Sequence, residues 1–127
     1  MEKAADVART YFELAGSDEL SSIMGEDVTW TIPESSPLGG VHRGREAVLD
    51  MLDRAFALYD ASTMKIDLPL VLGDDRWACV RFVVEAKTAK GLQWDGDYVA
   101  LFEVHDGKIQ AVREYFDTER NNAVVHA

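Results

Sequence analysis

An acidic residue among apolar neighbours is the most unusual chemical feature of this 127-residue sequence. Glu114 lies in the alternating segment from Gln110 to Asp117. A strand over that segment places Glu114 on the same face as Val112 and Phe116. A carboxylate in such a setting is costly unless it is paired or takes part in chemistry. Burial should raise its pKa, which makes Glu114 a candidate general acid or base.

Asp97 is the second candidate catalytic residue. Two-residue turns at Asp106-Gly107 and at Ala89-Lys90 set a strand register in which Asp97 lies diagonal to Glu114. Two carboxyl groups in such a pair can divide the acid and base roles. Two alternatives stay open: Asp97 lies at a solvated strand end, or Glu114 pairs with a buried arginine such as Arg81 or Arg113.

The same register gives the two faces of the predicted sheet different compositions. One face is apolar apart from the two acids and contains Val80, Phe82, Val84, Asp97, Val99, Leu101, Val112, Glu114 and Phe116. The other face is aromatic and rich in arginine, which is typical of a protein–protein interface, and contains Trp77, Cys79, Arg81, Val83, Trp94, Tyr98, Ala100, Phe102, Arg113 and Tyr115. A slip of one residue would exchange the faces of a strand.

The elements that must position these residues are helices first and strands afterwards. Hydrophobic spacing predicts helices over Glu2–Ala15, Ser17–Ile23 and Gly44–Asp60. Alternation and turn residues predict strands over Val28–Pro33, Thr63–Leu72, Trp77–Lys87, Leu92–His105 and Ile109–Asp117. A Pro/Gly loop is expected over 34–43. The tail from Thr118 onward is expected to be frayed or to form a short partner-exchanging end. Residues 1–127 therefore form a single α+β domain with an antiparallel meander.

A cavity is expected where the helices cover the apolar face of a curved sheet. Such cavities suit small hydrophobic ligands held by a few polar groups. Tyr11 and Trp30 could direct an O–H or N–H group into it, although core packing is an alternative for any aromatic residue. The candidate substrate-binding residues are Tyr11, Trp30, Ile32, Met51, Leu52, Phe56, Tyr59, Phe82, Val99, Leu101, Val112 and Phe116.

Histidines, metal-ligand patterns and glycine motifs give little further indication of function. His42 could be an acid–base group at the cavity mouth or an exposed loop residue. No metal-ligand spacing and no phosphate-binding glycine motif is present in the sequence, so no metal and no cofactor is expected.

The charge and composition of the sequence limit the partners and the compartment expected for the protein. The formal net charge of −10 opposes binding to nucleic acid and to anionic membranes, and no long apolar run predicts a membrane span. The lone Cys79 suggests a reducing compartment, so we expect a cytoplasmic protein.

Three stretches carry a resemblance to a known superfamily. They are Trp30-Thr31-Ile32-Pro33, the segment His42 to Val48 that leads into the long helix, and Phe102 to Ile109 followed by Arg113-Glu114-Tyr115-Phe116-Asp117. With the order of elements, they resemble the nuclear-transport-factor-2-like (NTF2-like) superfamily. That superfamily includes ketosteroid isomerases, limonene-epoxide hydrolases and SnoaL-like polyketide cyclases. The resemblance implies a cone: a curved antiparallel sheet wrapped around N-terminal helices, enclosing an apolar pocket.

The superfamily's functional residues match this sequence unevenly. The ketosteroid isomerase pattern has a catalytic base on the first strand, where this sequence has Ile32, and an acid that binds the oxyanion, where it has Val99. Only Tyr11 or Thr10 could match the tyrosine of the first helix. The SnoaL-like pattern has an acid on the last strand, which Glu114 matches, and a neighbouring histidine, which Val112 replaces.

The limonene-epoxide hydrolase pattern matches in part. Glu114 fits its last acid and Arg81 its arginine, but Val83 replaces the partner acid. Thr29 and Thr31 stand where a tyrosine and an asparagine are expected.

The resemblance therefore favours a SnoaL-like, cofactor-independent enzyme that acts on a hydrophobic carbonyl compound by aldol-type cyclisation or isomerisation. The alternatives are epoxide hydrolysis and a non-catalytic ligand-binding or dimeric scaffold module. The resemblance also implies a homodimer through the convex sheet face.

Overall fold

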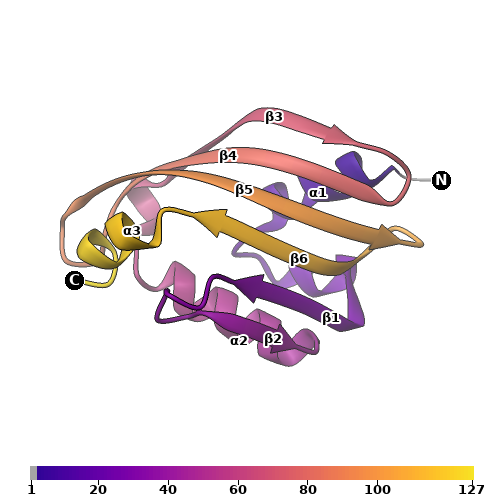
Figure 1. Cartoon of the computed structure of the whole chain (residues 1–127), viewed down its shortest axis with the longest axis horizontal. Helices are drawn as coiled ribbons and strands as arrows, with labels where there is room; N and C mark the ends of the chain where they lie inside the picture. Colours follow the sequence, from indigo (N-terminus) through magenta and orange to yellow (C-terminus); the bar gives the residue numbers. More distant parts are fainter. Residues whose placement is uncertain (1–2) are drawn as a thin grey trace.

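The computed structural model describes residues 3–127, which form helices against one curved sheet (Figure 1). The N-terminal part begins with a helix, a 3₁₀ helix and two strands, and a second helix and 3₁₀ helix follow: α1 (Ala4–Leu14), η1 (Asp18–Ile23), β1 (Met24–Ile32), β2 (Gly40–Arg43), α2 (Arg45–Phe56) and η2 (Ala61–Thr63). The rest consists of four strands and a short helix: β3 (Lys65–Gly73), β4 (Trp77–Lys87), β5 (Gln93–His105), β6 (Lys108–Phe116) and α3 (Thr118–Val124).

The six strands lie in the order β2-β1-β6-β5-β4-β3. Neighbours are antiparallel except β1 and β6, which run parallel with Trp30 opposite Val112. The predicted antiparallel meander is confirmed for β3 to β6, and β1 extends the sheet as a parallel neighbour of β6. The parallel pairing matters for the site, because it places a side chain from the start of the chain beside one from the last strand.

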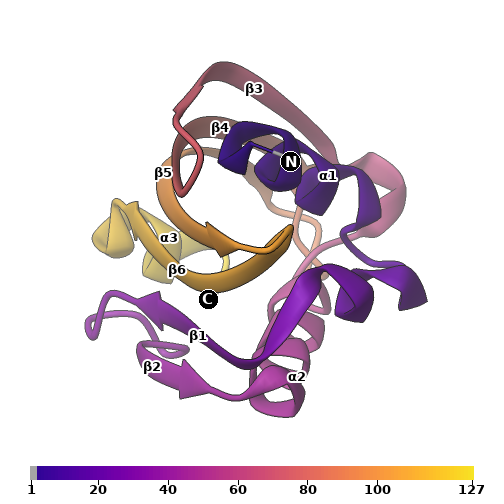
Figure 2. The ribbon, with the colours of Figure 1, turned by 90° about the vertical axis from the view of Figure 1, so that its right-hand side faces the viewer.

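The curved sheet wraps around the helices (Figure 2). α1 packs against β3, β4 and β5 through Ala4, Val7, Ala8 and Tyr11. α2 packs against β1 and β2 and buries Val48, Met51 and Leu52. Both stripes have helical spacing, so the helices bury apolar surface on the concave side of the sheet. The predicted α+β cone is confirmed. Glu2, where we predicted the start of the first helix, lies outside the described residues.

The β5–β6 hairpin contains a bulge that the sequence did not reveal. Asp106 and Gly107 form the predicted two-residue turn, both with positive φ (51° and 74°), and His105 pairs with Lys108. One step further, Gln110 is left unpaired, because Val104 pairs with Ile109 but Glu103 pairs with Ala111. Beyond the bulge, every β5–β6 pair is shifted by one residue from the predicted register.

The β4–β5 hairpin differs from the prediction as well. Thr88 N–H donates to Leu92 O, so the loop has three residues and ends at Gly91, whose φ is +83°. Val80 therefore pairs with Ala100 rather than with Val99. Each of the two errors shifts β5 by one residue relative to its neighbour. The side chains of β4 and β6 therefore lie on the predicted faces of the sheet, and those of β5 lie on the opposite faces to the predicted ones.

Three smaller expectations were also wrong. The predicted loop over 34–43 contains β2, which pairs with β1. The long helix ends at Phe56 instead of Asp60, because the backbone of Leu58 and Asp60 bonds to Ala89 and Lys87. The tail is not frayed: it forms α3, whose N-cap residue Asp117 accepts a hydrogen bond on its side chain from Arg120 N–H.

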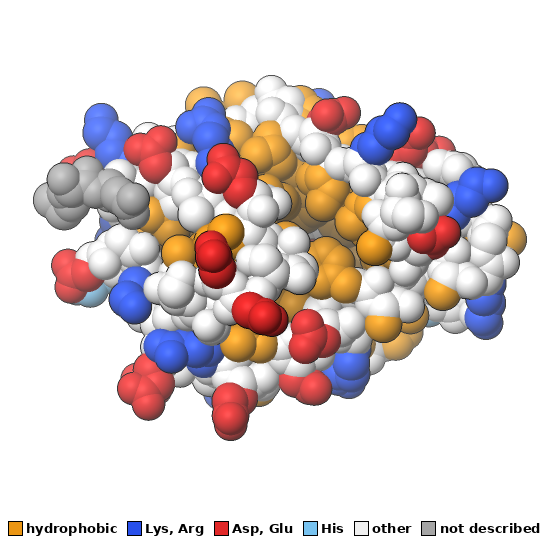
Figure 3. Space-filling model, turned by 180° about the vertical axis from the view of Figure 1, so that it is seen from behind, with side chains coloured by type: hydrophobic (Ala, Val, Ile, Leu, Met, Phe, Trp, Pro, Cys, Tyr) orange, Lys and Arg blue, Asp and Glu red, His pale blue; other side chains and the backbone are white. Residues whose placement is uncertain are grey.

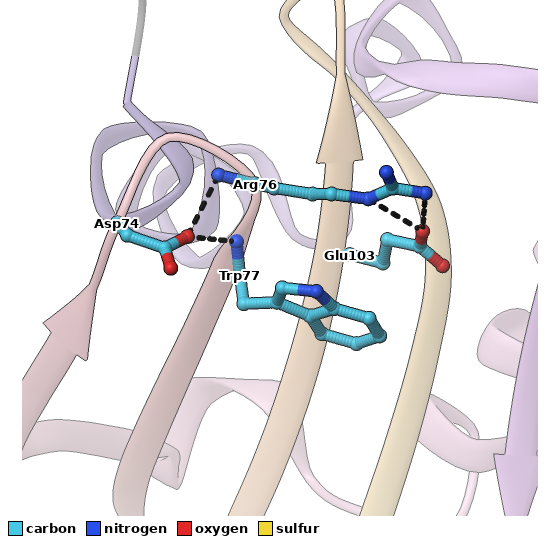
Figure 4. A network of polar contacts seen from close by, with 4 residues as sticks. All are labelled: Asp74, Arg76, Trp77 and Glu103. Carbon is cyan, nitrogen blue, oxygen red and sulfur yellow. Dashed lines mark hydrogen bonds and ion pairs between the residues drawn. The ribbon is translucent and has the colours of Figure 1, made fainter.

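A polar network fixes the edge of the sheet where β3 turns into β4 (Figure 4). Asp74 Oδ1 accepts hydrogen bonds from the backbone N–H groups of Trp77 (2.8 Å) and Arg76 (2.9 Å), which lower the pKa of its carboxyl group. Arg76 reaches across to Glu103 on β5 with an N–O distance of 2.7 Å. This network holds the turn against β5 at the opposite end of the sheet from α3.

Candidate functional site

A cavity of about 120 Å³ lies between the concave face of the sheet and the helices. Seen from the side where α1 and α2 lie, hydrophobic side chains gather in a hollow of the surface (Figure 3). Nine of the predicted substrate-binding residues line the cavity: Tyr11, Trp30, Ile32, Met51, Leu52, Phe56, Tyr59, Phe82 and Phe116. An apolar wall with few polar groups is the setting expected of a small-molecule site.

Among the described residues that line this cavity, Glu114 is the one with a carboxyl group. It lies on β6 opposite Ala100 of β5, and the small alanine side chain leaves space beside the carboxyl group. Burial raises the pKa of Glu114 to about 7, and a hydrogen bond from Trp30 opposes part of that rise. A carboxyl group with a pKa near neutrality can both take and return a proton at ordinary pH.

Trp30 is the hydrogen-bond partner of Glu114. Its indole Nε1–H donates to Glu114 Oε1 at 2.8 Å, across 84 positions of the sequence. The Trp30 side chain is 1% exposed and packs edge-on against Phe102 at 6.3 Å. The indole N–H is only a donor, so it stabilises the charged carboxylate and fixes its orientation. Neither arginine considered as an alternative partner lies in the site. Arg81 pairs with Asp97 on the outer face, where the exposed Arg113 donates to the Tyr115 hydroxyl.

Tyr11 places a phenol near the same carboxyl group. Its ring is buried and lies 5.2 Å from the ring of Trp30. Burial raises the pKa of Tyr11, and the negative charge of Glu114 adds to the rise, so the phenol stays neutral. A neutral phenol lining the cavity is available as a donor to a ligand oxygen.

A second polar cluster lines the cavity away from Trp30, and the sequence did not reveal most of it. Trp94 Nε1–H donates to the Tyr98 hydroxyl at 3.0 Å, and both side chains are buried. Tyr59 and Asn121, the latter from α3, line the same cavity as Tyr98. Burial raises the pKa of both tyrosines, so they too are neutral donors. The sequence did not predict Tyr98 as a cavity residue, because the predicted register of β5 placed its side chain on the outer face. It did not predict Asn121, because no ordered helix was expected after Thr118.

Asp97 is not part of the cavity. The β5 strand turns its side chain to the outer face, where Arg81 donates to both carboxylate oxygens at 2.7 and 3.0 Å. This pair lowers the pKa of Asp97. The prediction that Asp97 lies beside Glu114 in the site is wrong, because both hairpin registers differ from those assumed.

Three predicted substrate-binding residues are also displaced from the cavity. Val99 and Leu101 share the outer face with Asp97. Val112 is 0% exposed and belongs to the core beside Trp30, without lining the cavity. His42 does not line it either, since its Nε2 lies 2.7 Å from the carbonyl oxygen of Leu38. His126 of the C-terminal segment does line it, and burial lowers its pKa.

The described chain shows neither a metal cluster nor a membrane helix. Among residues 3–127, no group of three or more His, Cys, Asp or Glu side chains could hold a metal ion. Over the same range, no helix has the length and the apolar character needed to cross a bilayer.

Solved structures share this fold over almost the whole chain. An NTF2-like protein of unknown function from Burkholderia pseudomallei matches with a TM-score of 0.84 and 16% identity, covering 100% of both chains. A protein assigned as a SnoaL-like polyketide cyclase from Jannaschia sp. matches with a TM-score of 0.80 and 13% identity, covering 96% of this chain and 90% of the other. TerC, co-crystallised with polyporic acid, matches with a TM-score of 0.76 and 20% identity, covering 97% and 94%.

Sequence comparison identifies the family. No curated protein matches the sequence. The model of the SnoaL-like domain matches residues 8–112, from α1 to the middle of β6. The match covers most of the chain, and solved NTF2-like proteins share its fold. The protein therefore belongs to the SnoaL-like domain family.

Proposed function

We propose that this protein is a cofactor-independent enzyme in which Glu114 moves a proton on a hydrophobic carbonyl compound. The observation that supports the proposal best is the Glu114 carboxyl group itself: it lies in an apolar cavity, accepts a hydrogen bond from Trp30, and has a pKa raised to about 7. A carboxyl group with that pKa is half ionised near neutral pH, and general acid–base catalysis is most effective when the pKa of the catalytic group lies close to the working pH.

The proposed step is proton transfer at the carbon next to the carbonyl group. The Glu114 carboxylate takes a proton from that carbon, and the electron pair of the broken C–H bond forms an enolate. In a cyclisation, the enolate carbon attacks a second carbonyl group of the same molecule, and Glu114 returns its proton to the new alkoxide. In an isomerisation, Glu114 returns the proton to a different carbon. Both reactions balance without any co-reactant.

The known relatives support this class of ligand. One structural relative is assigned to the SnoaL-like polyketide cyclases, and another was crystallised with polyporic acid. We infer from these relatives that the ligand is an aromatic or polyketide-like molecule with carbonyl oxygens, because the apolar cavity suits such a molecule.

Proton exchange tests the proposal without knowledge of the natural substrate. The probe is 2-tetralone in D₂O, with deuterium incorporation next to the carbonyl group followed by NMR. The wild-type protein should accelerate exchange above the buffer rate, and Glu114→Gln should remove about 10²–10⁴-fold of the acceleration. Equal acceleration by both proteins would refute the role of Glu114.

The same assay separates the enzyme from a non-catalytic binding module. A binding module would hold 2-tetralone, as detected by calorimetry, without accelerating its exchange. Epoxide hydrolysis finds less support, because Arg81 and Asp97 lie on the outer face and bind each other there.

We also propose that the outer face of the sheet binds a second copy of the chain. Exposed apolar side chains cluster on that face of β3 to β6: Leu70, Leu72, Trp77, Val99 and Tyr115. The Arg81–Asp97 pair among them neutralises its own charges. Analytical ultracentrifugation should find a dimer, and Val99→Lys should shift it toward the monomer. A monomeric wild-type protein at high concentration would contradict the interface.

A further inference from the structure

Trp94, Gly96 and Tyr98 follow one another on the buried face of β5. Trp94 Nε1–H donates to the Tyr98 hydroxyl at 3.0 Å, although the two residues are 4 positions apart in the chain. Such a separation spans about 13 Å along an extended strand. The two side chains therefore lean toward each other along the strand and meet above the residue between them, and both are buried.

Gly96 is the residue that lets this contact form. A Cβ atom at its position would lie 2.6 Å from Trp94 Nε1 and 2.6 Å from Tyr98 Cε1, much closer than non-bonded atoms pack. The Tyr98 ring is also stacked on Phe82, with 4.7 Å between the ring centroids. The Arg120 guanidinium covers the Trp94 ring at 4.9 Å. The two rings thus fill the space that a side chain at Gly96 would need, and their neighbours hold them there.

The direction of this hydrogen bond makes Tyr98 a donor toward the cavity. An indole N–H can only donate, so the Tyr98 oxygen is the acceptor and the phenol keeps its own proton to donate. In the part of the chain that the structure describes, Trp94 is the one group hydrogen-bonded to the Tyr98 hydroxyl. Tyr98 lines the cavity and Trp94 does not, so a ligand meets the phenol while the indole stays behind it.

The Tyr98 hydroxyl lies apart from the Glu114 carboxyl group. Glu114 is opposite Ala100, and Tyr98 precedes that alanine by two positions, so Glu114 and Tyr98 are diagonal neighbours across the two strands. Side chains in that relation are about 7 Å apart at their first carbon atoms. The Tyr98 ring leans toward Trp94, away from Glu114, which increases the separation of the two polar groups. Because Arg120 of α3 covers Trp94, the Tyr98 hydroxyl marks the α3 end of the cavity (Figure 1).

We propose that Tyr98 donates a hydrogen bond to a second oxygen of the ligand, apart from the carbonyl group on which Glu114 acts, with Trp94 and Gly96 as its positioning residues. The inference rests on the proposed function only for the identity of the reacting carbonyl group. The ligand is then an aromatic molecule with two oxygen functions: a carbonyl group near Glu114 and an acceptor oxygen, of an ether or a second carbonyl group, at the α3 end. A buried donor of this kind disfavours ligands of the same shape that lack the oxygen, because they leave it unpaired.

Two ligands that differ at one position test the donor. The probes are 6-methoxy-2-tetralone and 6-ethyl-2-tetralone, in which a CH₂ group replaces the ether oxygen, and calorimetry measures both dissociation constants. In Tyr98→Phe, the dissociation constant of the methoxy compound should rise about 2- to 10-fold, the effect of one lost hydrogen bond. That of the ethyl compound should stay the same or fall, because it makes no hydrogen bond at this end of the cavity.

The positioning residues give a second test, which also serves if Tyr98→Phe folds poorly. Trp94→Phe keeps the Tyr98 hydroxyl but removes its orienting donor, and Gly96→Ala pushes the two rings apart. Each should weaken the methoxy compound selectively, and Trp94→Phe should do so less than Tyr98→Phe. A general loss of structure would instead weaken both ligands alike. The matched control is Tyr115→Phe on the outer face, where the hydroxyl accepts a hydrogen bond from Arg113, and it should change neither constant.

The outcomes separate this inference from the proposed function. Equal weakening of both ligands in Tyr98→Phe, or no weakening of either, would overturn the inference. A wild-type protein that does not bind 6-methoxy-2-tetralone would overturn it as well, and so would a larger selective effect in Tyr59→Phe, since Tyr59 lines the same cavity. If Tyr98→Phe is selective as expected but Glu114→Gln still exchanges 2-tetralone at the wild-type rate, the role of Tyr98 stands and the proton-transfer proposal fails.

Discussion

Glu114 and Asp97 lie on adjacent strands and have opposite environments. Glu114 of β6 faces the cavity, accepts one hydrogen bond from an uncharged indole, and has a pKa raised to about 7 by burial. Asp97 of β5 faces outward, binds the Arg81 guanidinium through both oxygens, and has a lowered pKa. The difference shows that the face of the strand, and not the residue type, decides whether a carboxylate here is a reactive group or half of a surface ion pair.

Proton-transfer activity should separate the two carboxylates most strongly. Glu114→Gln is expected to lose about 10²–10⁴-fold of the 2-tetralone exchange rate, whereas Asp97→Asn should keep it, because Asp97 lies outside the cavity. In the wild-type protein, the rate should rise with pH and level off above about 7, where Glu114 is ionised. A similar loss in both variants would mean that the two carboxylates act through the fold instead.

The stability of the protein should depend on the charge of Glu114 in an unusual direction. Its folded pKa of about 7 lies above the ordinary value of 4.5, so the folded state binds the proton more tightly than the unfolded chain does. The free energy of unfolding should therefore fall as the pH rises from 4.5 to 7, by at most about 3 kcal/mol, since one pKa unit corresponds to about 1.4 kcal/mol.

Urea denaturation at pH 4 and pH 8 measures this effect (roughly the two limits of the Glu114 titration). Glu114→Gln should be more stable than the wild type at the higher pH and equal to it at the lower one. Glu46→Gln, at an exposed position on α2, is the matched control. If Glu114→Gln and the wild type differed in stability by the same amount at both pH values, the charge of Glu114 would not lower the free energy of unfolding.

Removal of the Trp30 indole N–H should make the environment of Glu114 differ still more from that of Asp97. Trp30→Phe keeps an aromatic ring but leaves the Glu114 carboxylate without its donor, so the pKa of Glu114 should rise. The midpoint of the pH–rate profile should move upward by about one pH unit. Trp77→Phe on the exposed outer face is the control, and it should leave the midpoint in place. A downward shift in Trp30→Phe would contradict the assigned hydrogen bond.

The smallest expected effect is that of Asp97 on stability. Its lowered pKa means that the charged form stabilises the fold above the ordinary pKa of 3.8, and that this stabilisation is lost as the pH falls through the lower folded value. Asp97→Asn should therefore lower the melting temperature slightly at pH 7 and not at pH 2. Because the pair is exposed, about 1 M salt should remove most of the difference. A decrease that survives high salt would indicate a structural role beyond the ion pair.

The sequence predicted the inward position of Glu114 on the last strand correctly, and the reason is local. Alternation over β6 and the Asp106-Gly107 turn involve only neighbours in the chain, and they place Glu114 between apolar side chains wherever the strand packs. The partner of Glu114 was not predictable in this way, because Trp30 reaches it through the parallel pairing of β1 with β6. No local pattern in the sequence specifies which strand lies beside the last one.

Local patterns thus determined most of the helices and strands, though not β2 or α3, together with the helical stripes that cover the sheet and the acid on the last strand. Tertiary structure decided the rest of the site. The unpaired Gln110 and the three-residue loop ending at Gly91 turned Asp97 outward and Tyr98 inward. The packing of α3 brought Asn121 to the wall of the cavity. The physical reason is the two-residue period of a strand: a single extra residue in a hairpin reverses every side chain beyond it, and only the packed sheet fixes where that residue lies.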